Sequence, residues 1–219
     1  MLANSCGVLW PLCLACAVLA SPLGAQTPGD SSNSERDRPG SYLGAFFGGV
    51  STTMSGWSSS DPRLAFSTGV QWDRVFESGA FLRSGVFYTG RGNANVIAQY
   101  VEFPLLLGYR LPDDVPTRVF GMAGVQLGMV TSCKHQYEGN GISAEGSCSG
   151  PLGIDFVESH ETFDFGLVAG GGISISLGRA HLVLDFRVLQ GLRAVDNLGD
   201  AKNRGFTIGA AYMVPIGHK

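Results

Sequence analysis

The sequence predicts an all-β protein: an eight-stranded antiparallel up-and-down transmembrane β-barrel, preceded by a signal peptide. Three observations predict this fold. Large apolar residues alternate with small or polar residues in eight segments, which is the period of a strand with two different faces. Glycine is abundant, with 32 of 219 residues. Longer and shorter connections alternate between the segments, as in an up-and-down barrel.

The first 25 residues are predicted to be a secretory signal peptide. An apolar run, Val8–Ala20, is followed by the small residues of Leu23-Gly24-Ala25. The run is shorter than the roughly 20 residues that a transmembrane helix requires, so such a helix is the weaker alternative. A lipoprotein signal through Cys16 is also weaker, because Cys13 occupies a position where an aliphatic residue is expected.

The mature chain divides into a leader and one β domain. Residues 26–40 contain almost no apolar side chain and predict a flexible periplasmic leader. Residues 41–217 then form the predicted outer-membrane barrel, a length that suits a single β domain.

The segment Tyr100–Arg110 shows the strand pattern most clearly. Its odd-numbered side chains are all apolar, from Val101 to Tyr109. The even-numbered side chains, in contrast, include Glu102, Pro104 and Arg110. A helix would place the proline in its interior at a cost of about 3 kcal/mol. The segment is therefore predicted to be a strand with one apolar and one mixed face.

The same alternation predicts seven further strands, at about Ser41–Thr52, Arg63–Asp73, Gly79–Thr89, Arg118–Val130, Thr162–Ile175, His181–Leu189 and Arg204–Pro215. Phe81 and Phe87 interrupt the pattern in the third of the eight. The short links are Arg74–Ser78, Leu111–Thr117 and Ser176–Ala180. In an up-and-down barrel they would all lie at one end together with both chain ends, which is the periplasmic end of outer-membrane barrels.

The volume of the interior predicts which face points outward. An eight-stranded barrel has an interior just wide enough for its inward side chains, and four or five large apolar residues per strand would overfill it. The glycine-rich face is therefore predicted to point inward and the apolar face to contact lipid of the bacterial outer membrane; a soluble barrel is the alternative. Aromatic residues towards strand ends are predicted to form girdles at the membrane surfaces: Tyr42, Trp72, Tyr88, Tyr109 and Tyr212.

The inward face carries charges that would share a narrow lumen: Arg83, Glu102, Arg110, Asp164, Asp185 and Arg187. Unpaired charges are costly inside a protein, so we expect these side chains to form a network that plugs the barrel. In this prediction the three carboxylates pair with Arg83 and Arg187. The functional alternative is a polar pore, which eight strands leave little room for.

The cysteines predict one disulfide. Cys6, Cys13 and Cys16 lie in the predicted signal peptide, so Cys133 and Cys148 remain in an exported chain, where a pair predicts a disulfide. Closing a loop of about 15 residues would contribute roughly 3 kcal/mol at most. Two free thiols are the alternative. A metal site that also used His135 and His160 would match no common ligand spacing, so no metal is expected.

Composition excludes some functional classes. The chain has 15 Lys and Arg against 18 Asp and Glu, a formal charge of −3, so no basic surface predicts nucleic-acid binding. No phosphate loop, Gly-x-Ser-x-Gly motif or paired-carboxylate spacing is visible. No cofactor is therefore expected.

Several strands resemble one known family. The segment YVEFPLLLGYRL resembles the YLEIPLLL-type fourth strand of the outer-membrane β-barrel domain family, in its PorT-like group. FLRSGVFYTGRG, FDFGLVAGGGISI and LVLDFRVLQGL are similar to its third, sixth and seventh strands. The resemblance covers about Ser41 to Ile216 and implies an eight-stranded outer-membrane barrel without catalytic residues. The C-terminal VPIGHK departs from the Phe or Trp that ends many such barrels.

These observations predict a non-enzymatic integral outer-membrane protein. The polar loop Thr131–Glu161, on the external side, is the expected contact surface for a protein partner. One alternative is a component of a secretion or assembly system, as the PorT-like resemblance suggests. The other is a lipid hydrolase or acyltransferase using Ser159, His160 and Glu161, although adjacent residues at a strand end point to opposite sides.

Overall fold

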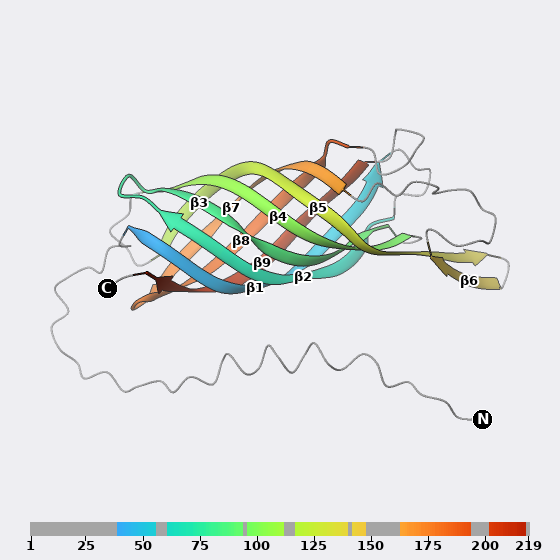
Figure 1. Ribbon diagram of the computed structural model, residues 1–219, viewed down its shortest axis with the longest axis horizontal. Coiled ribbons are helices and arrows are strands. Elements are labelled where there is room, and N and C mark those ends of the chain that lie inside the picture. Colours follow the sequence, from blue (N-terminus) through green and yellow to red (C-terminus); the bar gives the residue numbers. More distant parts are fainter. Residues whose placement is uncertain are drawn as a thin grey trace, which may run out of the picture. The chain divides into compact units, whose positions relative to one another are not determined.

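The computed structural model describes residues 39–55, 61–93, 96–111, 117–139, 142–147, 163–193 and 202–217 (Figure 1). It contains nine β-strands: β1 Gly40–Ser55, β2 Arg63–Val75, β3 Ala80–Gly92, β4 Val96–Arg110, β5 Thr117–Gly139, β6 Ile142–Ser147, β7 Phe163–Leu177, β8 Ala180–Gly191 and β9 Lys202–Ile216. The predicted signal peptide, and the leader up to residue 38, lie outside the described residues. In the part of the chain that the structure describes, no helix is long and apolar enough to cross a membrane.

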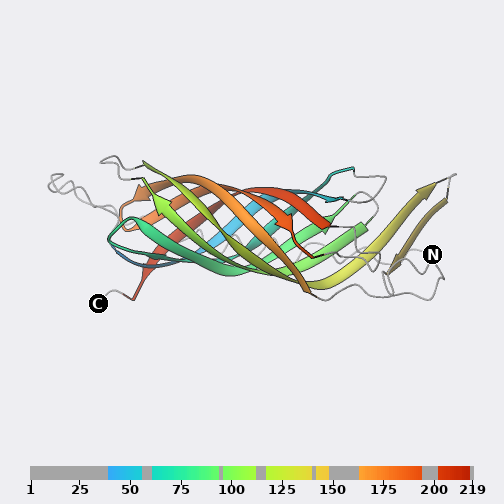
Figure 2. The ribbon, with the colours of Figure 1, turned by 90° about the horizontal axis from the view of Figure 1, so that it is seen from above.

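Eight of the strands form a closed antiparallel barrel, as predicted (Figure 2). Each strand pairs with its neighbours in the order β4-β3-β2-β1-β9-β8-β7-β5, and pairing between β4 and β5 closes the ring. β1 pairs with β9, so the first and last strands of the barrel are neighbours. Closure leaves no free edge between the eight strands of the barrel, which a lipid environment demands because no water is available there to bond free backbone groups.

Two short turns lie at the barrel end that also holds the start of β1 and the end of β9. The β2–β3 turn places Gly79 at φ 84° and the β7–β8 turn places Gly178 at φ 67°. Both angles lie in the left-handed region, which glycine adopts without a steric penalty. In the outer-membrane layout described above this is the periplasmic end.

At the opposite end, strand pairing continues beyond the predicted boundaries. A link of about ten residues was predicted between the third and fourth strands, but β3 runs to Gly92 and β4 starts at Val96. The pairs extend as far as Gly92↔Ile97. The predicted alternation of link lengths is therefore wrong at this position, because backbone pairing persists where the apolar alternation has already ended.

The predicted polar loop Thr131–Glu161 is also partly strand. β5 extends to Gly139 and pairs with β6, from Lys134↔Ser147 to Gly139↔Ile142. Figures 1 and 2 show this hairpin projecting beyond the other strands at the external end. Residues 148–162 of the predicted loop lie outside the described residues.

The large apolar face points outward, as predicted. Leu105, Leu107 and Ile208 are 52%, 63% and 60% exposed, whereas the neighbouring Leu106 is fully buried. Inward positions instead combine the charged side chains with four phenylalanine rings: Phe46, Phe81, Phe87 and Phe120. Phe81 and Phe87, which interrupted the sequence pattern, thus belong to the interior of the barrel.

Glycine provides the space for these rings. A Cβ atom on Gly209 would overlap the ring of Phe46, and a Cβ on Gly108 would overlap the ring of Phe81. Glycines on the inward face therefore allow large side chains to cross a narrow lumen, consistent with the volume argument.

Four of the five predicted girdle residues point outward, and one does not. Trp72, Tyr109 and Tyr212 lie near the periplasmic ends of their strands, and Tyr88 lies in the external half of β3. Tyr42 is 4% exposed and its ring packs at 4.8 Å against His181, so its assignment to the girdle is wrong. The physical reason is that successive side chains of a strand point to opposite faces. The next residue on β1, Leu43, is 39% exposed and points outward, so Tyr42 points inward.

Candidate functional site

The barrel lumen holds four arginines and four carboxylates that are at most 8% exposed: Asp73, Arg83, Arg91, Glu102, Arg110, Asp164, Asp185 and Arg187. They project from β2, β3, β4, β7 and β8. Their formal charges cancel, as expected where water cannot solvate an excess charge. They form two networks at different heights, which we call the Arg83 network and the Arg91 network.

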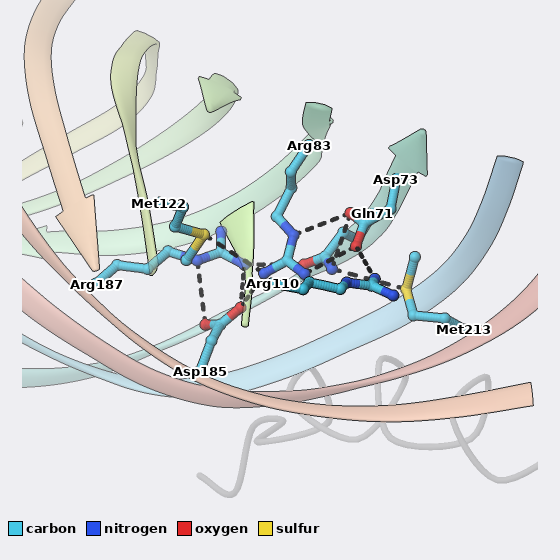
Figure 3. A network of polar contacts seen from close by, with 8 residues as sticks. All are labelled: Gln71, Asp73, Arg83, Arg110, Met122, Asp185, Arg187 and Met213. Atoms are coloured by element: carbon cyan, nitrogen blue, oxygen red, sulfur yellow. Dashed lines mark hydrogen bonds and ion pairs between the residues drawn. The ribbon is translucent and has the colours of Figure 1, made fainter. Parts of the chain in front are cut away.

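The Arg83 network lies in the periplasmic half of the barrel. Figure 3 shows its side chains. The guanidinium of Arg83 donates to both carboxylate oxygens of Asp73 at 2.9 and 2.8 Å, and to Asp185 at 2.7 Å. Arg187 donates to the two oxygens of Asp185 at 3.1 and 2.9 Å. Bidentate pairs of this kind are the strongest ion-pair hydrogen bonds in proteins. They connect β2, β3 and β8 across the lumen.

Neutral side chains complete the Arg83 network. Gln71 accepts a hydrogen bond from Arg187 at 2.8 Å. The guanidinium of Arg83 also lies 5.2 Å from the ring centre of Phe81 and 5.0 Å from that of Phe120. Arginine can stack on aromatic rings while its edge binds carboxylates, so the aromatic and ionic contacts reinforce one another.

The Arg91 network lies in the external half. Arg91 contacts Glu102 through Nε and Asp164 through Nη1, the latter at 3.5 Å. Asn203 donates to Asp164 at 2.7 Å. The guanidinium of Arg91 lies 5.3 Å from the ring centre of Tyr100. This network connects β3, β4, β7 and β9.

The two networks carry opposite formal charges. Three arginines and two aspartates give the Arg83 network +1, since Arg110 lies 3.9 Å from Asp73 and belongs to it. One arginine and two carboxylates give the Arg91 network −1. The attraction between them acts along the barrel axis through a low-dielectric interior, where charges interact more strongly than in water.

The structure places all six predicted lumen charges inside the barrel, but it pairs some of them differently. Asp185 contacts Arg83 and Arg187, whereas Glu102 and Asp164 contact Arg91. The pairing of Glu102 and Asp164 with Arg83 or Arg187 was therefore wrong. Arg91 was missing from the predicted network because the predicted third strand ended before it. Its side chain points inward like that of Arg83, since both residues lie on the same face of β3.

Asp73 was also missing from the predicted charge network, although the alternation of its strand places it on the inward face. It faces Arg83 directly in the register of β2 and β3. Register between strands, which periodicity does not supply, makes this aspartate the main partner of Arg83.

The space between the two networks is small. A cavity lined by Phe87, Thr89, Glu102 and Arg187, among other residues, has a volume of about 20 Å³, measured as the space open to the centres of water molecules. This is room for about one water molecule. The cavity is too small for an organic cofactor or substrate.

Cys133 lies on β5, half-buried beside Met54 and Val96. Lys134 pairs with Ser147, and Cys148 directly follows Ser147 in the sequence. The register of the described pairs thus supports the predicted disulfide, which stays a prediction because Cys148 lies outside the described residues.

Three further candidate ligand and catalytic residues also lie outside the described residues: Ser159, His160 and Glu161. Among the described residues, no group of three or more His, Cys, Asp and Glu could hold a metal ion.

The sequence matches a family model, outer membrane protein beta-barrel domain, over residues 25–197. The chain belongs to the outer membrane protein beta-barrel domain family. Together with the closed barrel, this membership places the protein in the bacterial outer membrane with its apolar face in lipid. No curated protein matches the sequence significantly.

Three solved structures align with this barrel. Neisserial surface protein A aligns with a TM-score of 0.50 at 15% identity, covering 80% of this chain and 97% of that one. The attachment invasion locus protein Ail of Yersinia pestis aligns at 0.42 and 13% identity, covering 80% and 99%. The outer membrane enzyme PagL aligns at 0.44 and 13% identity, covering 78% and 99%. At these identities the likeness concerns the fold alone.

Proposed function

We propose that the protein is a non-enzymatic outer-membrane barrel whose lumen is closed by its own side chains and whose external strands present a contact surface for a partner. The observation that carries the proposal is the pair of buried charge networks. They cross-link strands on different sides of the lumen at two heights.

The physical case for a closed lumen combines width with energy. An eight-stranded barrel leaves no aqueous channel unless its inward side chains are small. Here the lumen contains buried rings and arginines, and the cavity between the networks is about 20 Å³. Separating a buried ion pair leaves an uncompensated charge and costs about 3–5 kcal/mol, so opening by side-chain rotation is unfavourable.

Planar-bilayer recording tests the closed lumen. The purified mature barrel is expected to give no steady channel current. Replacing Asp73, Arg83 and Asp185 together by serine removes the centre of the Arg83 network and is expected to raise the frequency of current steps. Arg74→Ser is the matched control, because Arg74 lies on the same strand as Asp73 but points outward. A large, steady conductance of the wild-type protein would contradict the proposal.

One contact between a hydroxyl and a histidine allows the proposed absence of enzymatic activity to be tested. The Ser176 hydroxyl lies 3.5 Å from Nδ1 of His181, which is the geometry of a loose nucleophile–base pair. However, His181 is 4% exposed, and its position on the lumen side of the wall supports a packing role. Release of fatty acid from outer-membrane lipids by purified protein should equal that by Ser176→Ala. Wild-type activity above that of the variant would overturn this part of the proposal.

The β5–β6 hairpin supports the partner-contact part of the proposal, because it is the part of the described chain that projects furthest at the external end (Figure 2). Deleting residues 136–147 should abolish co-purification of a partner from membranes without changing barrel assembly. A partner belonging to a secretion or assembly machine would favour the PorT-like alternative. Retention of the partner after the deletion would place the contact elsewhere.

A further inference from the structure

Among the strand side chains whose exposure the structure describes, few outward-facing ones are charged, and these have one sign. Among the outward-facing strand side chains that the structure describes, the charged ones are Arg74, Lys134, Lys202 and Arg204. None of these described outward strand side chains is acidic. In this part of the wall the charges are therefore cationic, whereas those of the lumen are balanced.

We propose that the external rim of the wall at β8, β9 and β1 binds the phosphate group of an acidic, phosphorylated glycolipid in the outer leaflet. Lys202 and Arg204 lie on the same face of β9, two residues apart and thus about 6.6 Å along the strand. Arg204 is exposed, and its neighbours across the strands are Gln190 on β8 and Thr53 on β1. One phosphate can span two cations at this spacing.

The apolar belt begins immediately below this patch. The next outward residue on β9 is Phe206, which is 49% exposed, and its neighbour on β8 is Val188, which is 51% exposed. The patch therefore meets the apolar surface without an intervening polar row. A lipid with its headgroup on Lys202 and Arg204 would lay its acyl chains on Phe206, Val188 and Ile208.

The height of Arg204 agrees with a headgroup position. At about 3.3 Å per residue and a tilt of about 40°, the outward row from Arg204 to Val214 rises about 25 Å, the height of the apolar band of an outer-membrane barrel. Arg204 thus marks the external boundary of that band, because the chain ends lie at the periplasmic boundary. A guanidinium there can bind phosphate bidentately in a partly dehydrated interface.

Two of the outward cations serve as control positions. Arg74 lies near the periplasmic end of β2, and Lys134 lies on β5, three strands from β9 in the sheet order. Each is a single outward cation without a second one on its strand. A general preference of cations for the membrane surface would involve all four residues equally, whereas a phosphate site involves only the pair on β9.

Native mass spectrometry of the purified mature barrel in neutral detergent can test the site, with bisphosphorylated lipid A as the probe. Lys202→Ala with Arg204→Ala should weaken binding by about 30-fold, since each cation near the membrane surface contributes about fivefold. Arg74→Ala with Lys134→Ala should leave the affinity within about twofold of the wild type. The dephosphorylated lipid should bind the wild type and the β9 variant equally.

Three results would overturn the proposal: equal losses in the two double variants, no loss in the β9 variant, or full displacement of the lipid by millimolar inorganic phosphate, which would indicate a free-anion site. Heat-modifiable gel mobility verifies that each variant is folded. If the alanine variant fails to fold, Lys202→Gln with Arg204→Gln is measured in its place. Because this experiment measures lipid binding and tests neither the closed lumen nor the partner contact, its outcome is independent of the proposed function.

Discussion

At the scale of single residues, Asp185 has the most demanding position in the lumen. Its carboxylate accepts hydrogen bonds from Arg83 and Arg187 while it is 4% exposed. Each arginine also stacks on phenylalanine rings, so the guanidinium planes are held from two sides. The carboxylate therefore neutralises two cations that cannot turn towards water.

Asp185→Asn is expected to destabilise the barrel by about 3 kcal/mol or more, because it leaves Arg83 and Arg187 with one carboxylate fewer in a buried site. Urea unfolding of the refolded protein in lipid vesicles measures the change. Asp61→Asn is the control, since Asp61 is exposed and its replacement should change stability by less than about 0.5 kcal/mol. Equal stability of the two variants would show that the ion pairs contribute little.

Gly209 and Gly121 provide a second matched pair at this scale. A Cβ on Gly209 would overlap the ring of Phe46, whereas a Cβ on Gly121 would meet nothing within 4 Å. Gly209→Ala should cost about 1–3 kcal/mol through overpacking, and Gly121→Ala should be nearly neutral. The same unfolding experiment distinguishes them. Comparable effects would mean that the lumen can relax around an added methyl group.

At the scale of elements, the β5–β6 hairpin differs from the rest of the sheet. β5 continues beyond the barrel, and the described part of β6 pairs with β5 alone. An isolated two-stranded hairpin is only marginally stable in water. A covalent link at its base would therefore matter more here than within the closed barrel.

The predicted Cys133–Cys148 disulfide would provide that link. Replacing both cysteines by serine should speed protease cleavage within residues 134–147 on intact cells, while the barrel remains assembled. Mass spectrometry of cleaved peptides, with and without reductant, reports the bond itself. Alkylation of both cysteines in unreduced wild-type protein would favour the free-thiol alternative.

At the scale of the whole molecule, stability depends on a belt of outward hydrocarbon around a charged interior. Leu105 lies near the middle of the outward row of β4 and is 52% exposed, whereas Ile97 lies at the external end of the same row. The two positions sample different depths of one membrane-facing strand.

Leu105→Arg should therefore cost about 2–4 kcal/mol, and Ile97→Arg about 0–1 kcal/mol, as charge is tolerated near the membrane surface but not at its centre. Vesicle-reconstituted protein, unfolded with urea, gives both values. A soluble barrel would tolerate both substitutions alike, because both side chains would then face water.

The sequence was sufficient to predict the number of strands in the barrel, the direction of its two faces and its membrane location. These depend on a local property, the alternation of side chains along each strand, which is visible in Tyr100–Arg110 alone. The girdle assignment of Tyr42 failed because it used only the position of the residue near a strand end. The alternation of side chains along β1 directs this ring inward.

Which charges meet became visible only in the folded barrel. Asp73 and Arg91 became partners of Arg83 and Glu102 through the register between strands and the continuation of β3 beyond its apolar pattern. Register and strand extension are set by backbone pairing with residues distant in the chain. The alternation within one strand therefore shows that a charged side chain points inward. Its ion-pair partner depends on how the strands are aligned in the closed sheet.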